Sequence, residues 1–225
     1  MLGTAVKKFR PDWLYPTHLE LDIVNIESVH KFCSEYAIDT IVHAAAFIGV
    51  KPCDTFPEKA ILANIYGTAN IALVCRDLGI KLIYISTDYI YDHGESDEES
   101  NIYPMNKYAH SKLGGECAVQ MLDNFVIIRT SFGADEFPFD AAYIDQWTSK
   151  EPVSIIAGKI IHVVENGVEF CGVLNVGGER KSVYEYALFT APIGKTIKEA
   201  KRPDSNPLDT SMCMRKWDFF FGGKK

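Results

Sequence analysis

The sequence predicts an α/β protein built on a Rossmann-like, doubly wound parallel sheet. The first observation is a set of continuous apolar runs at residues 39–46, 81–87 and 124–131, the pattern of strands buried on both faces. The second is a helix-length stretch after each of the first two runs, at 57–78 and 107–122. Strands that alternate with helices along a chain form parallel sheets with helices on both faces.

The elements ahead of the first apolar run are shorter. Residues 1–13 are predicted to be the end of a helix that Pro11 breaks. Residues 14–24 are expected to form a short strand and turn that carry Asp22. Residues 26–37 have helical spacing, because four apolar side chains fall on one face: Ile26, Val29, Phe32 and Cys33.

After the third apolar run the alternation weakens. We predict loops at 132–150, a helix at 153–165, a short strand at 173–176, a helix from Ser182 to about Leu188, and an irregular tail at 201–217. Serine is a favourable residue to cap that last helix. The chain has no internal repeat, so one domain of ordinary size with a smaller C-terminal region accounts for its 225 residues.

Composition excludes several classes of function. The net charge of −7 argues against binding to nucleic acid, which favours a basic surface. The six cysteines form no C-x-x-C pair and the six histidines show no H-x-x-x-H spacing, so we expect no metal site. We find no signal peptide and no apolar run of transmembrane length, and we therefore expect no membrane partner and a reducing, cytoplasmic location.

Residues 82–116 hold the groups needed to reduce a carbonyl. A strand ends at Thr87, and the next helix carries Tyr108 and Lys112, which lie on one helix face because they are four residues apart. Hydride transfer to a ketone leaves an alkoxide that needs a proton. A tyrosine can supply it when a lysine ammonium lowers the phenol pKa from about 10. The Thr87 hydroxyl could bind the carbonyl oxygen as charge develops.

A second Tyr-x-x-x-Lys match, Tyr103 and Lys107, lies just upstream. Tyr103 precedes Pro104, and a residue before proline disfavours helical geometry, so these two side chains need not share a face. The later pair lies beyond the proline, on the helix itself. Either match alone would be an ordinary pair on a helix surface. The strand-end hydroxyl upstream is what favours catalysis by the later pair.

A larger set of motifs stands in order along the chain. They are Leu21-Asp22-Ile23, His43-Ala44-Ala45-Ala46, Asn64, Ser-Thr-Asp-Tyr-Ile-Tyr at 86–91, Pro104, Asn106, Tyr108-x-x-x-Lys112, Leu113, Gly115-Glu116 and Arg129-Thr130-Ser131. Together they resemble the extended short-chain dehydrogenase/reductase superfamily. Within it, the sequence is most similar to the dTDP-4-dehydrorhamnose reductase-like, sugar-nucleotide-binding family.

The resemblance implies a Rossmann fold that binds NADPH or NADH. The catalytic residues that it implies are Thr87, Tyr108 and Lys112, with Tyr108 as the proton donor. The cofactor-binding residues that it implies are Gly3, Asp22, Ile23, Ala44, Ala45, Ala46, Asn64, Ser86, Tyr108 and Lys112. Among these, Lys112 would bind the nicotinamide ribose, and Asp22 and Ile23 would lie near the adenine.

The substrate that the resemblance implies is a nucleotide-linked 4-keto-6-deoxy sugar, reduced at C4. The residues implied on the substrate side are Thr87, Asp88, Phe132 and Arg180. Arg180 could equally form a structural salt bridge. We therefore expect an NAD(P)-binding domain at 1–131 and a mixed C-terminal region at 132–225 that contributes to the substrate site. A homodimer is compatible with this interpretation.

The chain departs from the family pattern in two places. Phe132 stands where the reductases usually carry tryptophan, which keeps an aromatic wall but loses an indole N–H donor. The family also opens with a strand and a Gly-x-x-Gly-x-x-Gly turn, which seats a pyrophosphate on a helix N-terminus. Here Gly3 resembles the last glycine of that turn, so we expect the first strand and the earlier glycines to be missing.

Two other functions stay open at this point. The incomplete phosphate turn is compatible with a non-catalytic or regulatory protein that binds a sugar nucleotide or NAD(P); the regulatory subunit of methionine adenosyltransferase resembles this family. A sugar-nucleotide epimerase or dehydratase is the other alternative. Dehydratases of the superfamily carry an acidic residue beside the strand-end threonine, as Asp88 does here. The run at 86–91 favours a reductase.

Overall fold

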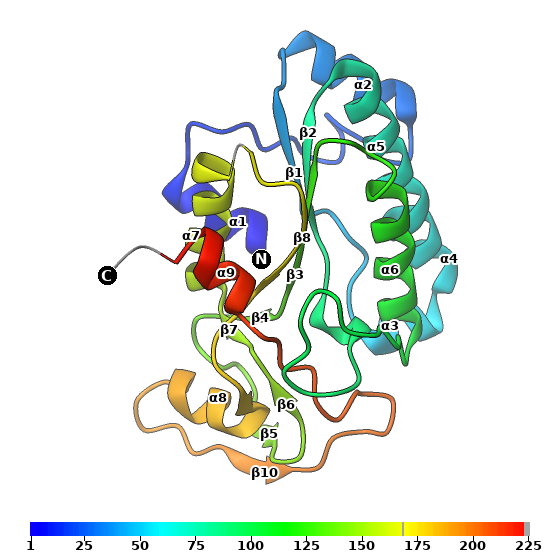
Figure 1. The fold of residues 1–225 in the computed structure, drawn as a ribbon. Coiled ribbons are helices and arrows are strands. Elements are labelled where there is room, and N and C mark those ends of the chain that lie inside the picture. The colour runs from blue at the N-terminus through cyan, green and yellow to red at the C-terminus, as the bar shows by residue number, and fades with distance from the viewer. Residues whose placement is uncertain (168, 223–225) are drawn as a thin grey trace.

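A computed structural model describes residues 1–167 and 169–222. At its centre is a parallel sheet with the strand order β1-β2-β3-β8 (Figure 1). The strands are β1 (Thr40–His43), β2 (Lys81–Ile85), β3 (Phe125–Thr130) and β8 (Gly172–Val176). The strands predicted at 39–46, 81–87, 124–131 and 173–176 and the predicted fold class are therefore confirmed.

The two middle strands are buried on both faces. Leu82 and Ile83 in β2, and Ile127 and Ile128 in β3, are each at most 1% exposed. Burial of this kind removes roughly 25 cal/mol of unfavourable hydration per Å² of apolar surface. It requires a layer of helices on each side of the sheet, as the apolar runs predict.

The helices form those two layers (Figure 1). One layer contains α2 (Ile26–Glu35), α5 (Gly67–Leu78) and α6 (Lys107–Val119). The other contains α1 (Leu2–Phe9), α7 (Val153–Asn166) and α9 (Arg215–Phe220). Within the second layer α1 packs against α7, and both contribute to one apolar cluster with β2, β3 and β8.

The helix predicted at 57–78 is continuous but not uniform. It comprises α4 (Pro57–Ala60), a π-helical turn η1 (Ile61–Tyr66) and α5, and it ends at Gly79 in the left-handed conformation. A shorter helix, α3 (Val50–Thr55), precedes it. The π-turn is a local feature that apolar spacing does not predict, and such turns are frequent at functional sites.

The prediction of a strand within residues 14–24 is wrong. That segment consists of turns and irregular backbone. Among the described residues β1 pairs with β2 alone, so no neighbouring strand offers hydrogen bonds to the segment. A side chain supplies hydrogen bonds that a neighbouring strand would otherwise give. Asn70 Nδ2 donates to the carbonyl oxygens of Ile23 and Val24, both at 3.0 Å.

The C-terminal region contains more strand structure than the expected loop and irregular tail. Its two-stranded pieces pair β4 (Phe132–Gly133) with β7 (Glu151–Pro152), β5 (Ala141–Tyr143) with β10 (Lys198–Ala200), and β6 (Trp147–Thr148) with β9 (Lys181–Ser182). Helix α8 (Val183–Thr190) begins as predicted, because Ser182 and Glu185 form a reciprocal capping box.

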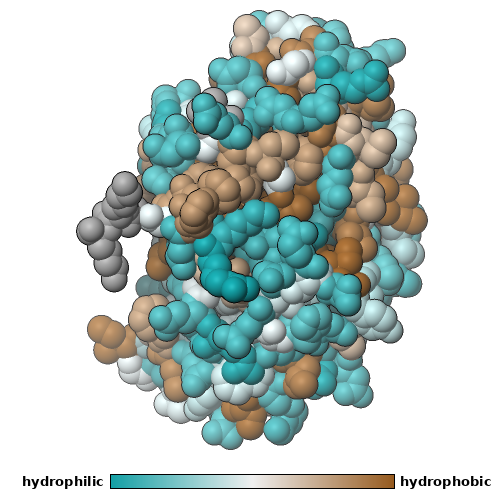
Figure 2. Space-filling view, viewed as in Figure 1, coloured by the Kyte–Doolittle hydropathy of each residue, from teal (hydrophilic) through white to brown (hydrophobic). Residues whose placement is uncertain are grey.

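The boundary at residue 131 stays a prediction. Both α7 and β8 lie beyond it in sequence, yet they belong to the main sheet and its helix layer. The visible face of the molecule is largely hydrophilic, with apolar side chains over α9 in its middle and on the side of α5 and α6 (Figure 2). No helix among the described residues is long and apolar enough to cross a membrane.

Candidate active site

The carboxyl end of β2 supplies one wall of the site. Beyond Ile85, Thr87 is 4% exposed and caps a short 3-10 helix, η2 (Asp88–Ile90), by accepting a hydrogen bond from the Tyr89 amide at 3.2 Å. A threonine favours such a cap, because its hydroxyl replaces a missing backbone acceptor. The cap fixes the Thr87 hydroxyl at the sheet edge where parallel α/β folds bind ligands.

The first turn of α6 brings Tyr108 to the same place. Asn106 caps the helix by accepting a hydrogen bond from the Ala109 amide at 2.9 Å, which sets where the helix begins. Tyr108 is its second residue, and its ring packs edge-on against Tyr89 at 6.4 Å. Burial raises the pKa of Tyr108 to about 12, while a hydrogen bond with Thr87 acts in the opposite direction. Thr87 and Tyr108 therefore meet, as the sequence predicts.

Lys112 lies one turn farther along α6 and is only 2% exposed. Burial lowers the pKa of this lysine to about 7, and the nearby Glu116 carboxylate partly offsets that effect. Its ammonium nitrogen lies 4.1 Å from the centre of the Tyr84 ring. A lysine with such a pKa changes its charge near neutrality, and it stands one helical turn from the tyrosine that would donate the proton.

The predicted cofactor residues fall into two groups. Ala44 and Ala45 are exposed where the chain leaves β1, and Ala46 is half-buried, so this edge offers an open surface of small side chains. Asn64 instead is fully buried in the π-turn. It accepts from the Phe47 amide at 2.7 Å and donates to Ser111 Oγ at 2.8 Å. Asn64 therefore braces the loop after β1 against α6.

The remaining predicted cofactor residues lie in α1, in the segment before α2 and just after β2. Gly3 is in the first turn of α1 and is exposed. Asp22 Oδ1 accepts from the Val24 amide at 3.0 Å, and Ile23 packs so close to Gly67 that a Cβ on that glycine would lie 2.8 Å away. Ser86 is buried, and its hydroxyl donates to Glu116.

Glu116 is the centre of a buried polar network that sequence reasoning missed. It forms two hydrogen bonds with Arg129, at 2.9 and 3.2 Å, and neither side chain is more than 5% exposed. Arg129 also donates to the Tyr91 hydroxyl at 2.8 Å. The pair stabilises each charge in the interior and ties α6 to β3 beneath the site. Both residues stand in the recognised motifs, but their contact is a tertiary one.

Asp88 acts as a clamp that holds the end of β2 against the C-terminal region. It is 2% exposed, and its Oδ2 accepts hydrogen bonds from Thr210 at 2.6 Å and from Thr148 at 3.3 Å. Burial raises its pKa, and these hydroxyls together with Lys150 oppose the shift. The carboxylate thus joins the end of β2 to two separate parts of the C-terminal region. No sequence signal pointed to either threonine.

Two predicted substrate residues have structural partners. Arg180 lies 2.8 Å from Asp209 and stacks over the Trp147 ring at 3.9 Å. Phe132 is half-buried in β4 and packs against the apolar cluster around α7. These contacts describe where the residues lie, and their roles toward a substrate stay predictions.

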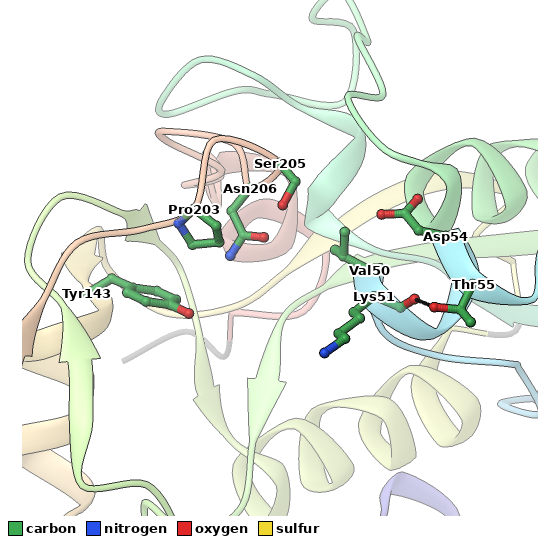
Figure 3. A pocket seen from close by; sticks show the side chains of 8 residues that line it. All are labelled: Val50, Lys51, Asp54, Thr55, Tyr143, Pro203, Ser205 and Asn206. Atoms are coloured by element: carbon green, nitrogen blue, oxygen red, sulfur yellow. Dashed lines mark hydrogen bonds between the residues drawn. The ribbon is translucent and has the colours of Figure 1, made fainter.

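A cavity of about 510 Å³ separates α3 from the C-terminal region (Figure 3). Its lining residues come from α3, β5 and the segment after β10: Val50, Lys51, Asp54, Thr55, Tyr143, Pro203, Ser205 and Asn206. The two residues that precede Tyr108 join its walls. Asn106 donates to the Ser205 carbonyl and Lys107 to the Asp54 carbonyl, both at 3.2 Å. The cavity therefore adjoins the N-terminal end of α6.

A comparison with protein families gives one match. The model of the RmlD substrate binding domain matches residues 2–170. A probable low-salt glycan biosynthesis reductase of Haloferax volcanii is 35% identical over 146 residues, which cover 62% of this chain and 48% of that protein. A dTDP-4-keto-6-deoxy-D-glucose reductase of Streptomyces niveus is also 35% identical, over 52% of this chain and 42% of its own length.

Another relative is named for a different function. Methionine adenosyltransferase 2 subunit beta of Xenopus laevis is 34% identical over 53% of this chain and 35% of its own length. The chain spans about half or less of the length of these curated relatives.

Solved structures show the same fold. The dTDP-4-dehydrorhamnose reductase of Bacillus anthracis, solved in complex with NADP, superimposes with a TM-score of 0.85 at 24% identity and covers 97% of this chain and 87% of that one. A hypothetical dTDP-4-dehydrorhamnose reductase of Sulfolobus tokodaii gives 0.84 at 23% identity, over 99% and 92%. Since the family model spans most of the sequence, this protein belongs to the RmlD substrate binding domain family.

Proposed function

We propose that this protein reduces the keto group of a nucleotide-linked 4-keto-6-deoxy sugar with NADPH or NADH, and that Tyr108 donates the proton. The observation that carries the proposal is the hydrogen bond between Thr87 and Tyr108 at the carboxyl end of β2, together with a buried lysine, Lys112, one turn farther along α6. The reductases among the relatives support the reaction class, because one is named for a dTDP-4-keto-6-deoxy sugar.

The residues at the sheet edge fit a nicotinamide cofactor. Ala44 and Ala45 leave exposed backbone after β1, where larger side chains would keep a ligand at a distance. Among the described residues, no group accepts a hydrogen bond from Lys112 Nζ, so this donor is available to a ribose hydroxyl. The cofactor, when bound there, would supply the hydride. Asp22 and Ile23 would hold the adenine end.

The protein's own side chains would supply the one proton that the reduction requires. Thr87 would hold the substrate oxygen, and Tyr108 would transfer its phenolic proton to that oxygen. The helix N-terminus and the Lys112 ammonium both favour the phenolate that remains. Burial raises the pKa of Tyr108 to about 12 in the free protein, so the tyrosine stays protonated until the site is occupied.

The cavity provides the substrate side. Lys51 lines it and is exposed, so it can approach an anionic diphosphate. Phe132 and Arg180 remain our candidates for the sugar wall and the nucleotide end. A homodimer is part of the proposal, because apolar side chains at helical spacing, Leu62, Tyr66 and Leu73, are each 46–50% exposed. Light scattering of the purified chain tests that assembly.

The test of the function is direct turnover. The purified chain is mixed with NADPH or NADH and dTDP-4-keto-6-deoxyglucose or its rhamnose-series epimer, and the loss of reduced cofactor and the formation of alcohol are followed together. We expect stoichiometric conversion. If cofactor and keto sugar both remain unchanged while both bind, the chain is not a reductase.

A regulatory role is the second candidate, and the likeness to a methionine adenosyltransferase subunit favours it. Copurification with a stoichiometric enzyme partner, without turnover of the keto sugar, would support that role. The structure offers less for a dehydratase. Its acid would be Asp88, whose Oδ2 already accepts hydrogen bonds from Thr148 and Thr210.

A further inference from the structure

One residue of β2 holds Lys112 at two points. The Tyr84 hydroxyl donates a hydrogen bond to the Lys112 carbonyl oxygen at 3.2 Å. The face of the same ring lies under the Lys112 ammonium, 4.1 Å from nitrogen to ring centre. Tyr84 is fully buried, so both contacts are shielded from water. A cation over an aromatic face is attracted to it, and the attraction strengthens when water is excluded.

The Tyr84 ring is fixed by its neighbours. Gly115 makes room for its hydroxyl, since a Cβ on this glycine would lie 2.3 Å from the hydroxyl oxygen. On the β1 side the His43 ring packs at 5.6 Å, and His43 Nε2 lies 3.0 Å from Thr68 Oγ1. The ring therefore has one position, and this position determines where the lysine charge can rest.

None of the charged groups around Lys112 is free to hold its ammonium in place, so the Tyr84 ring is its main contact. The titratable groups that face Lys112 are His43 on β1, Tyr84 on β2 and Glu116 on its own helix, where Tyr108 stands one turn away. Burial lowers the pKa of His43 to about 3, so this histidine is neutral. Glu116 attracts the ammonium but is bound to Arg129.

We propose that Tyr84 is a positioning residue that seats the Lys112 ammonium on its ring face and fixes where this charge rests. Only the catalytic consequence rests on the proposed function, because the seat exists without cofactor or sugar. Loss of the ring would leave a desolvated ammonium without its main contact. The Lys112 pKa would then fall by about one unit, a tenfold change in proton dissociation.

The test is an NMR titration of the free protein with isotope-labelled lysine, with the Lys112 signal assigned from Lys112→Met. In the unsubstituted protein, the Lys112 ε-methylene signals should be displaced upfield by the ring current of Tyr84. Ordinary lysine shifts for Lys112 would overturn the proposal. This readout needs no turnover, so it stands apart from the failure of the proposed reaction.

Three variants complete the test. Tyr84→Phe keeps the ring and should retain both the upfield shift and the pKa of Lys112. Tyr84→Leu should lose the shift and lower the pKa by about one unit. The matched control is Tyr186→Leu, at another buried tyrosine whose ring lies near a lysine, Lys150, and it should leave Lys112 unchanged. An unchanged Lys112 pKa in folded Tyr84→Leu would contradict the proposal.

Discussion

At the scale of single residues, the site depends on ionisable groups placed where burial works against their charge. Lys112 is the clearest case, because burial brings its pKa down to about 7 from the ordinary 10.5. A chain selected for stability alone would not keep a lysine there. Its cost to folding is therefore an indirect sign of function, and it can be measured without any substrate.

Lys112→Met should stabilise the protein below neutrality, by on the order of 3 kcal/mol. Below pH 7 the ammonium is present in the folded and unfolded states, and the folded state bears its full burial cost. Between pH 7 and 10.5 Lys112 loses its proton in the folded state but keeps it in the unfolded state, so the stability gained by Lys112→Met decreases. Above pH 10.5 this gain in stability vanishes. Urea unfolding at a series of pH values measures this. The exposed Lys31→Met is the control, and an equal gain there would refute the explanation.

Asp88 makes the second prediction at this scale. Asp88→Ala leaves the buried hydroxyls of Thr148 and Thr210 without their acceptor, which should cost about 1–3 kcal/mol of unfolding free energy. Asp88→Asn keeps an acceptor at the same place and should recover most of that loss. Chemical unfolding compares the variants. If the alanine variant is as stable as the unsubstituted protein, Asp88 does not hold β2 against the C-terminal region.

At the scale of elements, helix and strand positions were predictable where apolar pattern and packing agree. The strands β2 and β3 follow from their continuous apolar runs, and α8 follows from its serine cap. The segment 14–24 was mispredicted, because a strand needs a hydrogen-bonding neighbour and not only a favourable composition. The π-turn η1 was also missed, since apolar spacing does not reveal a local change to i→i+5 hydrogen bonding.

The contact between α6 and η1 gives a prediction for an element. Gly115→Ala would bring a Cβ within 2.7 Å of the Asn64 carbonyl oxygen and within 2.3 Å of the Tyr84 hydroxyl. We expect a loss of about 1–3 kcal/mol, because the packed helices must separate. Gly158→Ala on α7 is the matched control: its Cβ would meet no atom within 4 Å, so helix propensity should raise stability by up to about 1 kcal/mol. Thermal unfolding of both variants decides, and a similar effect at both positions would exclude the packing argument.

At the scale of the whole molecule, the placement of Tyr108 and Lys112 on one helix could be predicted from the sequence, but the nearby cavity could not. Tyr108 and Lys112 stand on one helix, and their spacing is local. The clamp on Asp88 joins it to Thr210, 122 residues away, and the cavity takes its walls from three separate segments. Such contacts follow from how the C-terminal region folds back onto the sheet, which no single motif encodes.

The two Tyr-x-x-x-Lys matches, whose tyrosines Pro104 separates in sequence, occupy different environments in the whole fold. In the structure Tyr103 is 63% exposed and lies outside α6, whereas Tyr108 lies in its first turn against Tyr89. The two tyrosines are close in sequence and differ in surroundings. They therefore provide an internal comparison in which substitution of Tyr103 should leave the turnover rate unchanged.

The most direct test of the central claim compares Tyr108→Phe with Tyr103→Phe in NADPH-dependent reduction of the dTDP-linked 4-keto-6-deoxy sugar. Loss of the proton donor should lower the turnover rate of Tyr108→Phe by about 10²–10⁴-fold, while cofactor binding persists. Tyr103→Phe should match the unsubstituted protein. An unsubstituted protein that turns over the sugar, with Tyr108→Phe equally fast, would contradict the assignment of Tyr108 as the proton donor.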